Sequence, residues 1–351
     1  KQYFEGVAPT AETQLHLDRC LTCRSCETTC PSGVHYSRLL EIGRERIDAD
    51  LPRPAWQRFK LWAIVRLFNS GWLFKVLLGF GQTVAPILPK TISSAIPAKQ
   101  VPPELPTTTN ARRVLMLSGC VQPTLTPNTN AMASRVLDKL GISTIEIDDR
   151  HCCGAVGLHT SQAEQGKQQV RRLIDLWWPH VESGIEAIVI SASGCGVTVK
   201  EYGELMKNEP DFAQRAAKIS ELACDISELI GRELDDNPRG ETISKRVALH
   251  TPCTLQHGLG LMGRVEPILQ KVGYQLCRVE EAHICCGSAG TYSILQPGLS
   301  KQLQANKQQA LTVDKPDVIA TANIGCQLHI GNGSQVPVVH WIELVYAALA
   351  D

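Results

Sequence analysis

Apolar residues follow two alternating periods from residue 113 onward, and the pattern occurs twice. Short apolar runs typical of buried strands alternate with stretches in which apolar residues recur at helical spacing. The expected strands are 113–120, 143–147, 187–195, 246–253, 274–279 and 317–326, and the expected helices are 131–141, 161–178, 226–230, 265–273, 299–311 and 341–345. Strands that alternate with helices predict a parallel sheet. We therefore expect an α/β protein with two duplicated Rossmann-like units.

The first hundred residues have a different pattern. Helical spacing in 36–47 predicts an amphipathic helix. The stretch 51–99 has seven basic residues, no acidic residue and seven of the chain's 18 aromatic residues, but Arg66 and Lys75 interrupt it before it could span a membrane. This basic helical connector lies either at a membrane surface or partner subunit, or against the chain's own domains. The proline-rich stretch 86–106 predicts a linker.

Composition narrows the class of protein. Lys and Arg balance Asp and Glu at 35 each, so no basic field indicates a nucleic-acid partner. Residues 1–18 lack the charged head and apolar core of a secretory signal, and we expect a cytoplasmic, reducing location. If the connector binds lipid, the protein is peripheral on the cytoplasmic face of the inner membrane. The chain's 14 cysteines are then expected to bind metal rather than to form disulfides.

The cysteines of the repeated part form one unit that occurs twice. In each unit a first cysteine precedes an adjacent cysteine pair, and the separation from Cys120 to Cys152 equals that from Cys253 to Cys285. A fourth cysteine follows each pair at nearly the same distance along the chain in both units. The two sets are Cys120, Cys152, Cys153 and Cys195, and Cys253, Cys285, Cys286 and Cys326.

Each of these cysteines follows a predicted strand. The carboxyl ends of parallel strands meet at one edge of a sheet, where three loops can bring four thiolates together. The alternative is that they are buried apolar side chains, which is common for single cysteines. Eight cysteines at matched positions favour a cofactor site in each unit. The other nearby candidates are expected to pack or to form loop hydrogen bonds: Cys224, Cys277, His151, His159, His257 and His283.

A third cysteine group lies near the start of the chain. Residues 20–31 have the spacing C-x2-C-x2-C-x3-C-P, by which ferredoxins bind a [4Fe–4S] cluster. Its cysteines are Cys20, Cys23, Cys26 and Cys30. Zinc also binds paired cysteines, but its sites space the pairs further apart and lack the trailing Cys-Pro. The last cysteine of such a run ligates the cluster of a second run. Residues 1–19 have no cysteine, so we expect incomplete clusters whose other ligands lie outside this chain.

These patterns predict four segments. They are a partial 4Fe-4S ferredoxin-type domain at 1–50, the connector with its linker at 51–110, and the two repeated domains at 111–240 and 241–351.

With these residues in place, the chain resembles the family of iron–sulfur subunits of bacterial glycolate oxidase, in which two ferredoxin motifs precede two CCG domains. The sequence motifs that carry the resemblance are Gly-Cys120-Val-Gln-Pro-Thr-Leu, Cys-Cys153-Gly-Ala, Ala-Ser-Gly-Cys195-Gly, Pro-Cys253-Thr-Leu-Gln-His257 and Cys-Cys286-Gly-Ser-Ala-Gly-Thr-Tyr. The family's first ferredoxin motif is missing. The resemblance implies [4Fe–4S] clusters and FAD-containing flavoprotein partner subunits that oxidise glycolate and D-lactate. This chain would pass their electrons toward membrane quinone and would hold no catalytic residue of its own.

One departure from the wider CCG family bears on the chemistry. Heterodisulfide reductase, whose CCG subunit is a member, holds a noncubane cluster through five cysteines that end in C-x-x-C. Here the positions three residues to either side of the last cysteine hold other residues: Ala192, Thr198, Asn323 and His329. Four cysteines predict at most one conventional [4Fe–4S]-like site per unit, or an empty one. Two alternatives stay open: a heterodisulfide-reductase-like or lactate-utilisation CCG oxidoreductase, and a metal-stabilised scaffold without redox role.

Overall fold

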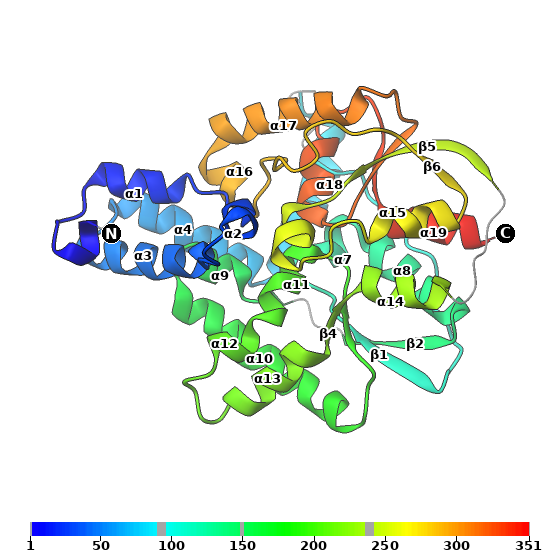
Figure 1. The fold of residues 1–351 in the computed structure, drawn as a ribbon, viewed down its shortest axis with the longest axis horizontal. Coiled ribbons are helices and arrows are strands. Elements are labelled where there is room, and N and C mark those ends of the chain that lie inside the picture. Colours follow the sequence, from blue (N-terminus) through cyan, green and yellow to red (C-terminus); the bar gives the residue numbers. More distant parts are fainter. Residues whose placement is uncertain (1, 90–95, 148–150, 236–241, 351) are drawn as a thin grey trace.

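The computed structural model describes residues 2–89, 96–147, 151–235 and 242–350. A helical N-terminal part lies to one side of two units, each built on a four-stranded parallel sheet (Figure 1). The predicted α/β fold with duplicated Rossmann-like domains is therefore confirmed. Part of the predicted linker and the expected border between residues 240 and 241 lie outside the described residues.

The first unit contains strands in the order β2-β1-β3-β4, all parallel. Its strands are β1 (Arg112–Met116), β2 (Ile142–Glu146), β3 (Ile188–Ile190) and β4 (Ala223–Asp225). Its helices are α7 (Gln122–Leu125), α8 (Pro127–Lys139), α9 (Ala155–His159), α10 (Ala163–Glu182), α11 (Ser193–Lys200), α12 (Tyr202–Leu205), α13 (Ala213–Leu222) and α14 (Ile226–Asp235).

The second unit repeats this topology, in the order β6-β5-β7-β8. Its strands are β5 (Ile243–His250), β6 (Tyr274–Leu276), β7 (Val318–Thr321) and β8 (Val338–His340). Its helices are the π-helical turn η3 (Thr254–Gly258), α15 (Val265–Lys271), α16 (Tyr292–Leu295), α17 (Pro297–Thr312), α18 (Ile324–Gly331) and α19 (Trp341–Ala350). The sequence did not predict β4 and β8, because such short strands are too brief to show a strand period.

The N-terminal part is helical throughout its regular structure. Its elements are η1 (Gln2–Glu5), α1 (Ala11–Asp18), α2 (Ser25–Thr29), α3 (Tyr36–Asp50), α4 (Ala55–Phe68), α5 (Gly71–Val84) and η2 (Ala85–Ile87). The helix predicted at 36–47 is confirmed as α3. Arg53 ties α1 to α3, because its guanidinium donates to Asp18 and Asp48. No helix in the described part of the chain has by itself the length and apolar character to cross a bilayer, although α4 and the segment 71–87, bent by 94°, meet both criteria as a pair.

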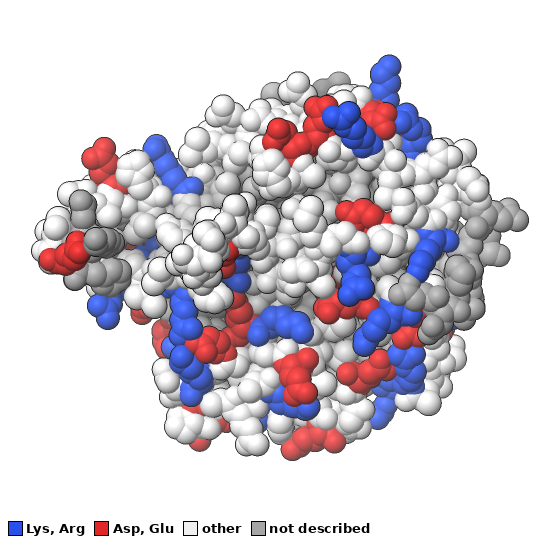
Figure 2. Space-filling view, viewed as in Figure 1, with Lys and Arg blue, Asp and Glu red and all other residues white. Residues whose placement is uncertain are grey.

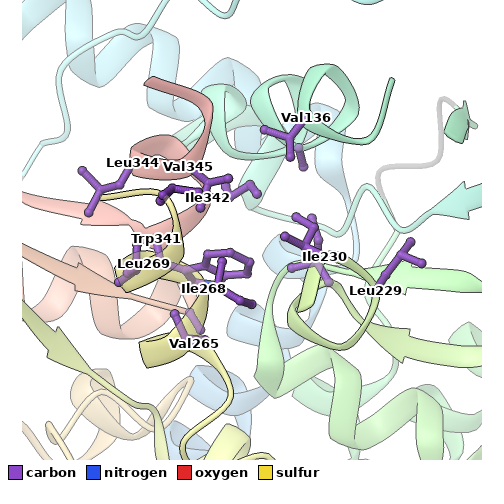
Figure 3. Close-up of a cluster of buried hydrophobic side chains, with 14 of the residues drawn as sticks. Val136, Leu229, Ile230, Val265, Ile268, Leu269, Trp341, Ile342, Leu344 and Val345 are labelled. Carbon is purple, nitrogen blue, oxygen red and sulfur yellow. The ribbon is translucent and has the colours of Figure 1, made fainter. Parts of the chain in front are cut away.

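One hydrophobic cluster contains buried residues of both units. Helices α8 and α14 of the first unit face α15 and α19 of the second, with Val136 and Ile230 opposite Ile268 and Trp341 (Figure 3). All four side chains are buried. The units therefore share apolar surface that neither could bury alone.

Charged side chains are distributed without a single-sign field over the face drawn in Figure 2. Basic and acidic residues alternate there, and much of the surface over the N-terminal helices and the centre is uncharged. This agrees with the net charge of zero.

Candidate metal centres

The four cysteines of the first unit converge at the carboxyl edge of its sheet. Cys120 follows β1, Cys152 and Cys153 precede α9, and Cys195 lies in the first turn of α11. Their thiols form a chain of hydrogen bonds in which Cys152 contacts both Cys120 and Cys153, and Cys153 contacts Cys195. The structure thus brings together the four residues that the sequence selected, although Cys195 lies in a helix rather than in a loop.

Their ionisation is strongly coupled. Hydrogen bonds from Cys120 and Cys153, together with backbone N–H groups of Val156 and Gly154, hold the pKa of the Cys152 thiol well below its ordinary value. The same bonds, with burial, raise the pKa of Cys120 and Cys153 well above theirs. Several thiolates this close together repel one another, so a cation or cluster is needed for them all to ionise.

The second unit brings its four cysteines together in the same way. The Sγ atoms of Cys253 and Cys285 are 4.0 Å apart. The backbone N–H of Gly287 donates to Cys285 Sγ at 3.4 Å. Hydrogen bonds from neighbouring thiols lower the pKa of Cys285 to about 3. Asn323 Nδ2 lies 3.5 Å from Cys326 Sγ, so one of the two residues at the C-x-x-C offset from Cys326 donates a hydrogen bond to it.

The second group also contains a histidine, His250, which sequence reasoning did not select. A nitrogen of His250 and the sulfurs of Cys286 and Cys326 lie within 4.8 Å of one another. His250 ends β5, and its Nδ1 is 2.9 Å from Thr321 Oγ1. Burial lowers the pKa of His250 to about 3. The alignment that pairs Cys120 with Cys253 places Leu117 at this position in the first unit, and that mismatch was the signal available in the sequence.

The histidines that the sequence did single out form ordinary contacts. His257 Nδ1 lies 2.7 Å from Thr28 Oγ1, and His159 lies 3.5 Å from a carboxylate oxygen of Glu41. Exposed His283 lies 3.7 Å from Glu281. The unmatched cysteines also behave as expected, since burial raises the pKa of Cys224 to about 12 and keeps it a neutral thiol.

The ferredoxin-like run forms the segment between α1 and α3, and Cys26 lies in its short helix α2. Cys20, Cys23 and Cys30 are half-buried and Cys26 is exposed. Burial raises the pKa of Cys23, and so do the charges of Cys285, Cys20 and Cys26. Cys30 stands apart, because its pKa is lowered by hydrogen bonds from nearby backbone N–H groups, those of Val34, Ser32 and Gly33. Thus Cys20 and Cys26 act on the charge of Cys23, whereas backbone N–H groups dominate at Cys30.

This run is docked beside the second cysteine group. Cys23 is close enough for its charge to raise the pKa of Cys253. Between the two groups, the hydroxyl of Tyr292 donates to the carbonyl of Arg19 at 3.3 Å. Burial raises the pKa of Tyr292, and the charges of Cys285 and Cys20 raise it further. No pattern in the sequence indicated this contact, which joins the start of the chain to its last quarter.

Two further contacts hold the run in place. Arg24 forms a bidentate ion pair with Glu201 of the first unit, at 2.6 and 2.8 Å. Thr28 bonds His257 of the second. Thr22 and Arg24 both have positive φ, a conformation uncommon outside glycine, so tertiary contacts impose the loop's shape.

The donor sets fit iron–sulfur clusters. Each repeated unit offers four convergent, largely buried thiols with N–H groups directed at sulfur, which is how proteins hold and tune such clusters. Zinc would accept four thiolates as well. The ferredoxin spacing of the adjacent run favours iron.

Comparison with known proteins gives the family. A family model for the cysteine-rich CCG domain matches twice, at residues 114–200 and 247–331. The glycolate oxidase iron–sulfur subunit of Escherichia coli K12 is 47% identical over 99% of this chain and 86% of its own length. The probable glycolate oxidase iron–sulfur subunit of Bacillus subtilis is 28% identical over 97% of this chain and 84% of its own length. Lactate utilization protein A of Bacillus licheniformis is 24% identical over 66% of this chain and 98% of its own length. On this identity and coverage, the chain belongs to the family of glycolate oxidase iron–sulfur subunits, with two CCG cysteine-rich domains.

Proposed function

We propose that this chain is the electron-transfer subunit of a glycolate oxidase complex, an oxidoreductase. The observation that carries the proposal is the position of the ferredoxin-like run, whose Cys23 lies beside Cys253 and Cys285 of the second CCG site. Two groups of thiols with cluster-binding character that lie near enough to affect one another's charge suit a path for electrons better than two unrelated structural sites. The relatives named for glycolate oxidase and for lactate utilisation support an oxidoreductase that acts on 2-hydroxy acids.

Twelve cysteines are the proposed cluster ligands. They are Cys20, Cys23, Cys26, Cys30, Cys120, Cys152, Cys153, Cys195, Cys253, Cys285, Cys286 and Cys326. A bound iron–sulfur cluster supplies reversible one-electron transfer. The surrounding chain fixes the thiols, directs N–H groups at them and keeps the CCG sites largely dry, which together set their redox properties. Arg24 and Tyr292 hold the run against the two units.

Substrate oxidation belongs to partners in this proposal. FAD-containing flavoprotein subunits would oxidise glycolate or D-lactate and pass electrons to this chain, which would deliver them toward membrane quinone. The helices α4 and α5 are the proposed contact with a partner or membrane surface. They bury Ile64 and Val65 against the protein but leave Trp72 and Phe80 exposed by 71% and 68%. Exposed aromatic residues next to basic ones suit such a surface.

The rival disulfide-reductase chemistry has less support. That chemistry in the wider family depends on a fifth cysteine, and neither residue at the three-residue offsets from Cys326 is a cysteine: Asn323 donates to Cys326, and His329 contacts Ser300. In the first unit the corresponding residues are Ala192 and Thr198, and neither offers a thiol. Four-thiol sites favour electron transfer over bond cleavage at the cluster.

The first experiment is metal analysis with EPR on the anaerobically purified protein. Cys153→Ser and Cys286→Ser are each expected to lower iron and sulfide and to alter the reduced-state spectrum. The matched control is Cys224→Ser, because Cys224 is a partly buried thiol without a repeat counterpart. Zinc in place of iron, or unchanged iron in both variants, would leave the CCG units as scaffold and overturn the proposal.

The docking surface needs a separate experiment. The triple variant Trp62→Ser, Trp72→Ser, Phe80→Ser is expected to fold normally, because these side chains are 50–71% exposed. Compared with the wild type, less of the triple variant should be recovered in a pull-down with flavoprotein subunits or in sedimentation with anionic vesicles. The assay in which binding falls shows whether this surface binds a protein partner or a membrane. Met262→Ser, at an apolar side chain 70% exposed elsewhere, is the control. Undiminished recovery of both partners would show that this face docks neither.

A further inference from the structure

The two CCG sites have matched cysteines but different surroundings. The close contact between the glycine after each cysteine pair and a later helix shows which residues of α10 and α17 are equivalent. In the first unit a Cβ at Gly154 would lie 3.0 Å from the carbonyl oxygen of Gly166 in α10, and in the second a Cβ at Gly287 would lie 2.6 Å from that of Ser300 in α17. Two turns further along each helix, at equal separations from these contacts, lie Leu173 in α10 and Lys307 in α17. A lysine therefore stands in the second unit where the first has leucine.

Lys307 is fully inside the protein, with 1% of its surface exposed. Its ammonium group donates to the backbone carbonyls of Glu281 at 2.7 Å and Ala282 at 3.4 Å, in the loop that leads to the cysteine pair. Those carbonyls are neutral, and a buried cation is costly unless anions compensate its charge. Burial lowers the pKa of Lys307 below its ordinary value. The nearby groups that can carry negative charge oppose this effect and favour the protonated ammonium; they are the thiols of Cys286, Cys285 and Cys326 and the carboxylate of Glu281.

The difference extends along the wall behind the cysteines. Leu117 and Ile190 of the first unit are apolar and buried, whereas His250 and Thr321 occupy the equivalent strand ends of the second and contact each other at 2.9 Å. At these three positions the first site thus has aliphatic side chains, whereas the second has a cation and a polar pair. These three replacements therefore distinguish the second site from the first.

We propose that Lys307 makes the second CCG site the easier of the two to reduce, by placing a fixed positive charge behind its cysteines. This rests on the proposed function, in which both units hold clusters. Reduction adds one electron to a site that is already anionic, and a nearby cation in a dry interior favours the added charge. Leu173 gives the first site no such help. The second site then has the higher reduction potential and is also the site beside the ferredoxin-like run. Electrons are therefore held preferentially at the site near Cys23.

The test is a redox titration of the full-length holoprotein followed by EPR, in which a mediator dye supplies the electron. Lys307→Met removes the charge and keeps the length of the side chain. At a fixed potential it should lower the ratio of reduced to oxidised second site at least tenfold, which is a shift of about 59 mV for a one-electron couple. The first-site signal should not change. Lys301→Met, on the exposed side of the same helix, should leave both sites unchanged.

Additional variants separate charge from structure. Lys307→Arg should retain the wild-type potential, and Lys307→Gln, which keeps a donor for the Glu281 carbonyl, should behave like Lys307→Met. Loss of iron in the Met and Gln variants but not in Arg would also support the requirement for charge. An unchanged second-site potential in Met or Gln variants with full iron would overturn the inference. If Cys286→Ser leaves the iron content of the wild type unchanged, the second unit holds no cluster and the proposed function itself fails.

Discussion

At the scale of single residues, the cysteine pairs depend on the glycine that follows them. Gly154 and Gly287 have φ of +96° and +89°, a region that side chains with a Cβ rarely adopt. Both also let a later helix, α10 or α17, approach the turn, since a Cβ at either glycine would meet the backbone of that helix. The glycine of the Cys-Cys-Gly motif is therefore required by the backbone conformation, while the two cysteines supply ligands.

Gly287→Ala tests this requirement. The left-handed conformation alone costs about 1–2 kcal/mol with alanine, and the contact with Ser300 at 2.6 Å adds a clash that only a helix shift can relieve. We expect a larger loss of unfolding free energy in urea than for Gly290→Ala, and loss of iron from the second unit. Gly290 also has positive φ, +61°, but has open space around its Cβ direction. Equal effects of the two changes would contradict the role of close helix packing.

The residue scale also shows where sequence reasoning succeeded and failed. The duplicated cysteines were predicted because spacing along the chain is visible in a sequence. His250 and Lys307 were missed, although each departs from an apolar residue in the first unit, because a lone polar residue in an apolar run carries no indication of what it faces. Spacing therefore predicted the thiols but not the charges behind them.

At the scale of elements, the strands and long helices followed from periodicity, and the short ones did not. The helix predicted at 161–178 is observed as α10 (Ala163–Glu182), and that at 131–141 as α8, which begins earlier, at Pro127. Proline is favoured in the first turn of a helix, and that start signal was available. The docking of α2 was beyond prediction, because it depends on contacts between residues far apart in sequence.

The ion pair between Arg24 and Glu201 is expected to hold α2 in its docked position. Arg24 is largely buried, with 13% of its side chain exposed, and bonds Glu201 through both guanidinium nitrogens. Glu201→Gln should speed amide hydrogen exchange in residues 20–30 while it changes global stability by less than about 1 kcal/mol, as for most partly exposed pairs. Glu221→Gln, which breaks the exposed pair with Lys218, is the control. Unchanged exchange in the run would mean that Tyr292 and His257 suffice to hold it.

At the scale of the whole molecule, the two CCG units behave as one folding body. Trp341 of α19 is fully buried in the core that includes α8 and α14 of the other unit. Trp341→Ala should therefore cost about 3–5 kcal/mol, as for other buried tryptophans. Hydrogen exchange should report the loss in residues 114–200 and 247–331 alike. Destabilisation confined to the second range would show that the units unfold independently.

The contact between the units also predicts a dependence on pH, through His340. This side chain is buried, its Nε2 donates to the Ser191 carbonyl of the first unit at 2.9 Å, and its Nδ1 accepts from the Ile342 N–H at 3.2 Å. Together the two bonds require the neutral ring, and burial lowers the pKa of His340 to about 4 from its ordinary 6.5. The unfolded chain therefore binds a proton before the folded one does. The stability from this group is complete above pH 6.5 and is lost as the pH falls toward 4.

The measurement compares the wild type with His340→Gln in urea at pH 7 and pH 5. Buried Asp225, whose pKa is raised to about 6, and Glu343, which accepts from the His340 N–H, are present in both proteins, so their titration largely cancels. The wild type's advantage should shrink by about 2 kcal/mol between the two pH values, since each pKa unit corresponds to about 1.4 kcal/mol. Parallel stability curves would mean that His340 is already protonated in the fold, or that water replaces the Ser191 contact. A shrinking advantage would show that the contact between His340 and Ser191 stabilises the fold only while the ring is neutral.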